Sequence, residues 1–158
     1  AGKTGSVDRV PFSPVPTRTE FVAFDGGDAG EVDLGSADIV VSGGRGLGSA
    51  DGFKVIREFA KAIGAAVGAS RAAVDSGWIP YRHQVGLTGR TIRPKVYFAC
   101  GISGQIQHLA GMSSAKAIVA INTDPDCPMM KAATLSVAAD LHEVLPLVAA
   151  EIRKRKGA

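Results

Sequence analysis

Polar side chains crowd together at residues 100–111, CGISGQIQHLAG, directly after an apolar run at 96–100 that indicates a buried strand. Ser103, Gln107 and His108 can each hydrogen-bond a ligand, and the glycines around Ser103 let a ligand approach the backbone. Ser103 is expected to cap the helix that follows. A strand, a glycine turn and a helix N-terminus together favour a phosphate-bearing ligand, because the first backbone amides of the helix point at it.

A second glycine-rich turn, GGRGLG at residues 43–48, approaches a dinucleotide-binding fingerprint without matching it. Gly44 and Gly46 supply the first pair of glycines, but Ser49 stands where the third glycine belongs. A tight turn without a ligand is the alternative interpretation. Arg45 favours a ligand, because a guanidinium in this turn can grip a phosphate with two hydrogen bonds or lie against a flat ring.

Short apolar strands alternate with helices from about residue 37 onward. Strands are predicted at 39–41, 65–67, 96–100 and 116–121, and helices at 51–63, near 104–110 and at 140–155. Gly64 is expected to stop the first helix, and Pro146 to break or restart the last one. This alternation predicts an α/β fold, with an open, doubly wound parallel sheet and helices on both faces. The polar clusters all follow strands, so we expect them to meet at one edge, where such sheets bind ligands.

Composition narrows the class of protein. The 158 residues suit one domain, or one domain with an extension, and 18 basic against 15 acidic residues give no sign of nucleic-acid binding. No apolar run approaches the ~20 residues of a membrane span, so we expect a protein that is not embedded in a membrane. Cys100 and Cys127 have neither metal-ligand nor disulfide-framework spacing and indicate a reducing compartment. We expect no metal site, because no cluster of Cys or His has metal-ligand spacing. We expect no catalytic residue, and neither a nucleotide-binding P-loop nor a serine-hydrolase arrangement is present.

Residues 1–35 differ from the rest of the chain. Glycine, proline, serine, threonine and acidic residues dominate there, with one strand-like run at 19–24. We interpret 1–35 as a linker or as the remnant of a preceding domain, and 36–158 as the ligand-binding domain.

Five segments, in this order, resemble the C-terminal FAD-binding domain of electron transfer flavoprotein alpha subunits. They are VSGGRG at 41–46, VGASR at 67–71, QVG at 84–86, GISGQIQHLAG at 101–111 and IVAIN at 118–122. The resemblance runs from about residue 36 to residue 147. It implies that 36–158 form a Rossmann-like domain with FAD in an extended crevice, and that 1–35 are the linker or remnant of the N-terminal domain.

The resemblance also implies which residues contact FAD. They are Arg45, Ser70, Arg71, Gln84, Val85, Gly86, Leu87, Thr88, Ser103, Gly104, Gln105, Ile106, Gln107, His108, Asn122, Asp140 and Leu141. The Thr88 hydroxyl is expected to donate toward the ring nitrogen that takes up a proton. Arg71 and His108 are expected to place a cation or donor beside the flavin, which raises its reduction potential.

Two of these assignments have structural alternatives, and the chain departs from the family at two places. Asp140 is equally suited to capping the last helix, and His108 to being a hydrogen-bonded histidine of a helix. Leu87 stands where the family usually has Gln, and Thr134-Leu135-Ser136 replaces a more typical Asp-Tyr-Gly.

The implied function is electron transfer rather than enzymatic catalysis. FAD would take electrons from acyl-CoA dehydrogenases of fatty acid beta-oxidation and pass them to a membrane quinone oxidoreductase, in a heterodimer with the beta subunit. The implied compartment is the mitochondrial matrix in a eukaryote or the cytoplasm in a bacterium. Two alternatives stay open: a flavin-bifurcating relative that also oxidises NADH, and a non-redox regulatory domain that binds ADP or AMP.

Overall fold

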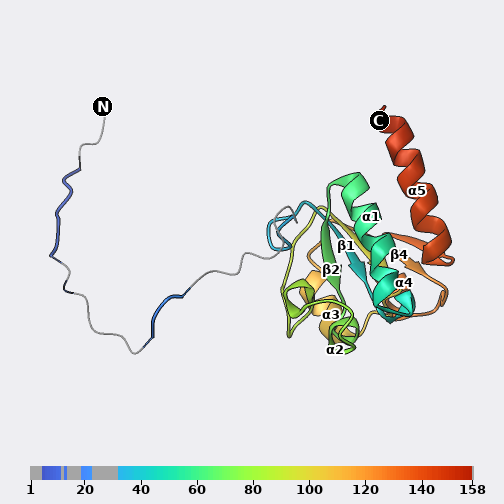
Figure 1. Cartoon of the computed structure of the whole chain (residues 1–158), viewed down its shortest axis with the longest axis horizontal. Coiled ribbons are helices and arrows are strands. Elements are labelled where there is room, and N and C mark those ends of the chain that lie inside the picture. The colour runs from blue at the N-terminus through green and yellow to red at the C-terminus, as the bar shows by residue number, and fades with distance from the viewer. Residues whose placement is uncertain (1–4, 12, 14–18, 23–31, 158) are drawn as a thin grey trace.

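A parallel sheet lies at the centre of the part of the chain that the structure describes (Figure 1). The computed structural model describes residues 5–11, 13, 19–22 and 32–157. Within them the strands are β1 (Ile39–Gly43), β2 (Ala66–Ala69), β3 (Val96–Cys100), β4 (Ala117–Asn122) and β5 (Leu135–Ala138). They lie in the order β2-β1-β3-β4-β5, and every neighbouring pair is parallel. This confirms the predicted open α/β sheet.

Four of the five strands coincide with predicted apolar runs, to within one or two residues at each end. The exception is β5, which the sequence did not reveal because Leu135 and Ser136 are exposed and no continuous apolar run marks it. Of the strand-like run at 19–24, residues 19–22 form neither strand nor helix, and 23 and 24 lie outside the described residues.

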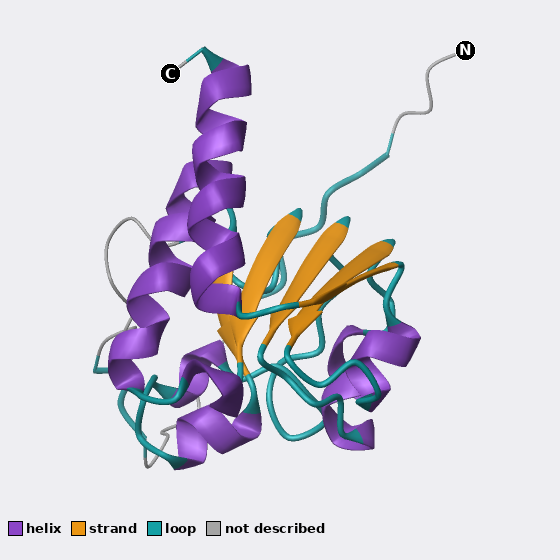
Figure 2. Ribbon diagram, turned by 90° about the vertical axis from the view of Figure 1, so that its right-hand side faces the viewer, coloured by secondary structure: helices purple, strands orange, loops and turns teal. Residues whose placement is uncertain are grey.

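Helices cover both faces of the sheet, as predicted (Figure 2). On one face, α1 (Phe53–Ile63) and α5 (Leu141–Lys156) pack together over Val41, Cys100 and Ile121. On the other face, α3 (Ile106–Met112) and α4 (Pro128–Ala132) pack over strand residues that include Val40, Tyr97 and Ala120. Successive strand residues therefore enter opposite cores, because side chains alternate along a strand.

The helix boundaries follow local signals, with one exception. Three residues in a 3₁₀ turn (Ala50–Gly52) precede α1, and Gly64 ends α1 as predicted, its amide donating to the Ala60 carbonyl. The predicted break at Pro146 is wrong: α5 runs continuously through this proline. Pro146 lies on the exposed side of α5, so water can reach the His142 carbonyl that loses its helical partner. No helix within the described residues is both long and apolar enough to cross a membrane.

The connections between strands create a switch point between β1 and β3. From β1 the chain passes through α1 to β2 at one edge, and it returns from β2 to β3 on the other side of β1. From β3 the chain passes through α3 to β4, and then through α4 to β5 at the other edge of the sheet. At such a point the turns after neighbouring strands diverge and leave a crevice beyond the carboxyl ends of the strands.

Candidate functional site

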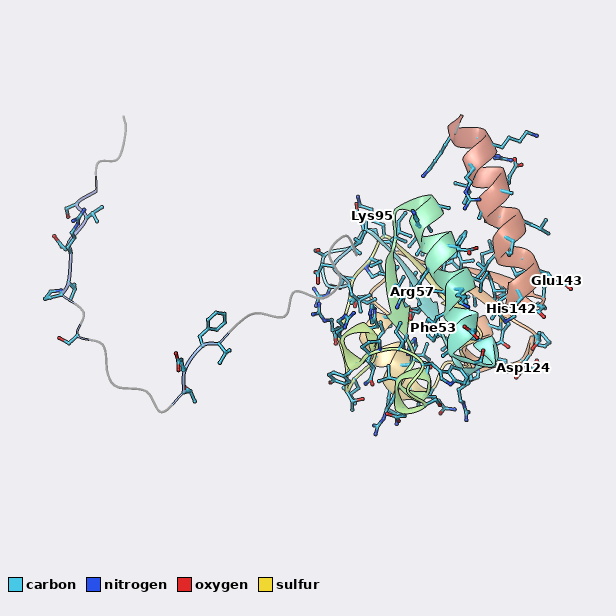
Figure 3. The ribbon with its side chains drawn as sticks, viewed as in Figure 1. Phe53, Arg57, Lys95, Asp124, His142 and Glu143 are labelled. Atoms are coloured by element: carbon cyan, nitrogen blue, oxygen red, sulfur yellow. The ribbon has the colours of Figure 1, made fainter. Side chains whose placement is uncertain are left out.

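A cavity of about 510 Å³ lies at this edge of the sheet. Its walls come from the turns that follow β1, β2, β3 and β4, together with the loop at 84–88. Figure 3 shows Asp124, which follows β4 and lines the cavity, on the opposite side of the domain from Lys95, which precedes β3. The volume is in the range of small-molecule and cofactor sites.

Fourteen of the seventeen predicted contact residues line this cavity; the other three are Ile106, Asp140 and Leu141. Ile106 is the first residue of α3 and its side chain is exposed. Asp140 caps α5, its carboxylate accepting from the His142 amide at 2.8 Å, and Leu141 is buried in the core between α5 and the sheet. The capping alternative for Asp140 is thus confirmed, and an FAD contact for these three residues stays a prediction.

Seven further residues line the cavity without having been predicted: Gly46, Ala72, Asp75, Gly101, Ile102, Asp124 and Cys127. Two of them carried a readable signal. Asp75 lies four positions after Arg71 on the same helix face, and Asp124 lies two positions after Asn122 in the same turn. Cys127 carried none, because it reaches the cavity from the turn before α4.

Two glycine turns pack backbone against backbone at the floor of the cavity. The Gly46 amide donates to the Gly101 carbonyl at 3.0 Å, and the Gly44 amide donates to the Cys100 carbonyl at 3.0 Å. A Cβ on Gly46 would lie 2.6 Å from the Gly101 Cα, so no side chain fits there. The ends of β1 and β3 therefore meet as bare backbone, which leaves space for a ligand above them.

The segment after β3 is a loop, and the predicted cap at Ser103 is wrong. The N-cap of α3 is Gln105, and the helix begins at Ile106. Gly101 and Gly104 have φ of 63° and 85°, a left-handed conformation that interrupts any helix before Gln105. A Cβ on Gly104 would also lie 2.4 Å from the Met129 amide nitrogen. The Ser103 hydroxyl is not used as a cap and lies along the cavity.

Ser70 and Arg71 form the wall after β2. The Ser70 hydroxyl caps α2 (Arg71–Asp75), accepting from the Ala73 amide at 3.4 Å, so its own hydrogen can still be donated to a ligand. The Arg71 guanidinium donates to the Asp75 carboxylate at 3.2 Å, and both side chains are exposed. An exposed pair of this kind holds Arg71 only weakly, so the guanidinium can turn toward a bound anion.

The loop that carries Thr88 is held from several sides. The Gln84 side-chain amide donates to the Thr88 hydroxyl oxygen at 3.0 Å, and the Tyr81 hydroxyl donates to the Thr88 backbone carbonyl at 2.6 Å. The Leu87 amide donates to the Gln107 carbonyl at 2.7 Å, which ties the loop to α3. Because the Thr88 hydroxyl oxygen accepts, its hydrogen remains available, as the donor role predicted for it requires.

His108 lies in the inner wall and is uncharged. It is 7% exposed, and its Nε2 lies 2.8 Å from the phenolic oxygen of Tyr97. Burial lowers the pKa of His108 to about 4, so the imidazole is neutral near pH 7. Of the two roles predicted for Arg71 and His108, a cation or a donor, the neutral ring of His108 suits the donor role, which stays a prediction. The positive charges of the cavity wall belong to Arg45 and Arg71.

Comparisons with known proteins agree with this geometry. Residues 33–113 match the family model described as "Electron transfer flavoprotein FAD-binding domain". An electron transfer flavoprotein subunit alpha of Thermoanaerobacterium thermosaccharolyticum is 58% identical over 125 residues, covering 79% of this chain and 38% of the relative. A probable mitochondrial alpha subunit of Caenorhabditis elegans is 47% identical over 152 residues (96% and 46%), and an alpha subunit of Bacillus subtilis is 45% identical over 152 residues (96% and 47%).

The chain spans less than half the length of these three relatives. Among solved structures, a ligand-bound E. coli protein matches with a TM-score of 0.45 and 16% identity, covering 78% of this chain and 73% of that chain.

Proposed function

Since the chain belongs to the electron transfer flavoprotein alpha-subunit family, we propose that its cavity binds FAD and that the protein carries electrons instead of transforming a substrate. The observation that carries the proposal is the convergence of fourteen predicted contact residues on one cavity. They come from the ends of four strands and one loop, at the place in the sheet where ligands bind. Chance surface polarity would not gather residues so distant in sequence.

The residues present fit FAD in two independent ways. Gly46 and Gly101 line the cavity with backbone and carry no side chain, as close approach of a pyrophosphate requires. The Nδ1 atom of His108 is buried and has no hydrogen-bond partner among the described residues, although His108 lines the cavity. A buried polar atom of this kind is ordinarily satisfied by a partner or a ligand.

The roles of the chain's own residues follow from chemistry and position. Arg45, in the turn after β1, would bind the pyrophosphate, and Ser70 and Ser103 would donate hydroxyl hydrogens to it. Asn122, after β4, would hold the adenosine end. The Thr88 hydroxyl would donate a hydrogen bond toward the flavin ring, and the Arg71 guanidinium would place a positive charge over the face of the ring. When bound, FAD supplies the ring system that accepts and releases electrons.

Exposed apolar side chains beside the cavity support a partner that closes over the flavin. Leu87 is 69% exposed and Ile106 is 80% exposed, and the Leu87 amide is bonded to the residue after Ile106. We propose that the beta subunit covers this rim. In the full heterodimer, electrons would come from acyl-CoA dehydrogenases and leave to a membrane quinone oxidoreductase, in a mitochondrial matrix or a bacterial cytoplasm.

Parallel titrations of the purified chain with FAD and with ADP test the cofactor. FAD should bind much more tightly than ADP, and Arg45→Ala and Ser103→Ala should each weaken FAD binding. Lys95→Ala is the matched control, because Lys95 is an exposed cation whose ion pair with Asp38 lies at the amino end of the sheet. Equal affinities for FAD and ADP would contradict the proposal and favour the regulatory domain that binds ADP or AMP. Failure to bind FAD even with the beta subunit present would contradict it as well.

A further inference from the structure

A fully buried residue of the sheet is hydrogen-bonded to a residue of the cavity wall. Tyr97, in β3, is 0% exposed, and its phenolic oxygen lies 2.8 Å from Nε2 of His108 in α3. The ring centroids are 6.1 Å apart and the ring planes are tilted by 53°. His108 lines the cavity, whereas Tyr97 does not. Tyr97 is therefore connected to the cavity by its hydrogen bond with His108.

The protonation states decide which atom donates in this contact. Burial raises the pKa of Tyr97 well above its ordinary value, so the phenol keeps its hydrogen. Burial lowers the pKa of His108 to about 4, so its neutral ring carries one hydrogen, on either Nδ1 or Nε2. Only one hydrogen fits between the phenolic oxygen and Nε2.

The surroundings of the two rings favour donation by Tyr97. Hydrogen bonding to the Val85 backbone opposes the lowering of the His108 pKa by burial, although Nδ1 has no partner at full hydrogen-bond geometry among the described residues. A backbone group with this effect is an acceptor, so a hydrogen on Nδ1 suits it. Ser42, also 0% exposed, opposes the raising of the Tyr97 pKa by burial, as a donor to the phenolic oxygen would, although its Oγ has no partner at full hydrogen-bond geometry among the described residues.

We propose that Tyr97 is a positioning residue that donates its phenolic hydrogen to Nε2 of His108, keeps the imidazole proton on Nδ1 and fixes the ring in the cavity wall. The effect on FAD rests on the proposed function, but the position of the proton does not. The cofactor would meet a neutral imidazole of fixed orientation. If Tyr97 accepted instead, the proton would sit on Nε2, and a contact that merely stabilised the core would leave the cofactor affinity insensitive to Tyr97.

Nitrogen NMR of the ligand-free chain tests the position of the proton, because the ¹⁵N shift separates a protonated imidazole nitrogen from a bare one. The chain has three histidines, and the His108 signal is identified by its loss in His108→Asn. We expect Nδ1 protonated and Nε2 bare in the wild type, and a mixture of both forms in Tyr97→Phe. A protonated Nε2 in the wild type would overturn the proposal without any variant having to fold. An unchanged proton position in a folded Tyr97→Phe chain would overturn it too.

Cofactor titration tests the consequence for binding. Tyr97→Phe keeps the ring and removes only the hydroxyl, and it should weaken FAD binding by roughly threefold to tenfold, the range expected for one net hydrogen bond. Ser136→Ala is the control, because it removes a hydroxyl that donates to the Met130 carbonyl at 2.7 Å, two strands away in β5. Equal FAD affinities for Tyr97→Phe and wild type would overturn the positioning role. If neither chain binds FAD, the proposed function fails, and the NMR result alone decides the role of Tyr97.

Discussion

Gly111 of α3 packs directly against Gly86 of the cavity loop. A Cβ on Gly111 would lie 2.4 Å from both the amide nitrogen and the Cα of Gly86. The Gly111 carbonyl also accepts from the Ile92 amide at 2.8 Å, so the chain is fastened to α3 again just beyond the loop. This contact therefore sets the distance between two walls of the cavity.

Gly111→Ala should separate the two walls. The methyl group meets backbone and cannot be accommodated by a side-chain movement, so we expect a loss of about 1–3 kcal/mol in the free energy of unfolding. This loss should outweigh the higher helix propensity of alanine. Urea unfolding measures the first effect, and FAD titration should show weaker binding. Ala110→Ser, on the exposed side of the same helix, is the control. A Gly111→Ala chain as stable as the wild type would show that the two walls can move apart freely.

Arg71→Ala should lower the reduction potential of bound flavin and leave the fold intact. The side chain is 67% exposed and its ion pair with Asp75 lies at the surface, so stability should change by less than about 0.5 kcal/mol. A cation beside the ring stabilises the negative charge that reduction adds, and its removal should disfavour reduction. Potentiometric titration of the FAD-loaded protein measures the change. Arg71→Lys keeps the charge and should retain much of the potential; equal potentials for Arg71→Ala and wild type would remove Arg71 from this role.

Acidification should destabilise the fold through His108. Its pKa is about 4 in the folded protein, against about 6.5 in an unfolded chain, so the unfolded state binds more protons between these values. The free energy of unfolding should therefore fall as the pH drops from about 6.5 toward 4, by up to about 3 kcal/mol. Urea unfolding at a series of pH values measures this slope, and His108→Gln should flatten it. The pKa of Asp33 is lowered by its hydrogen bonds with Ser36 and Arg90, so its contribution to the free energy of unfolding is lost only at a more acidic pH than that of His108.

Pro146→Ala should stabilise the protein. α5 continues through Pro146, so alanine restores one backbone hydrogen bond without changing the path of the chain. Proline costs about 3 kcal/mol in a helix interior, part of which is offset because proline also restricts the unfolded chain, and we expect a net gain of about 1–2 kcal/mol. Thermal and urea unfolding check this. Leu147→Ala, at an exposed neighbouring position, should change stability little. A less stable Pro146→Ala chain would mean that the proline is needed to shape α5.

The sequence predicted the sheet better than the details of the site. Val96–Cys100 and Ala117–Asn122 are continuous apolar runs, and burial on both faces requires that pattern. The edge strand β5 has no such requirement, since three of its four residues are exposed. At the site, Ser103 has the right residue type for a cap, but the positive φ of Gly104 decides where the helix begins.

His108 shows a second limit of prediction from sequence. Its position behind Ser103 and Gln107 predicted a ligand contact, and the structure places it in the cavity wall. Its charge depends on burial, and its hydrogen-bond partner Tyr97 reaches it from β3 across the interface between sheet and helix. The spacing of residues within one helix or strand cannot predict a contact between two elements.

The charges of the cavity wall bear on how quickly a ligand arrives. With His108 neutral, the charged side chains among the described lining residues are Arg45, Arg71, Asp75 and Asp124, two of each sign. Opposite charges cancel beyond a Debye length, about 8 Å at physiological ionic strength, so the wall exerts little long-range pull on a polyanion. A phosphate-bearing ligand is thus recognised only after it has entered. Its association rate should be nearly independent of salt, and added salt should act mainly by speeding dissociation from the two arginines.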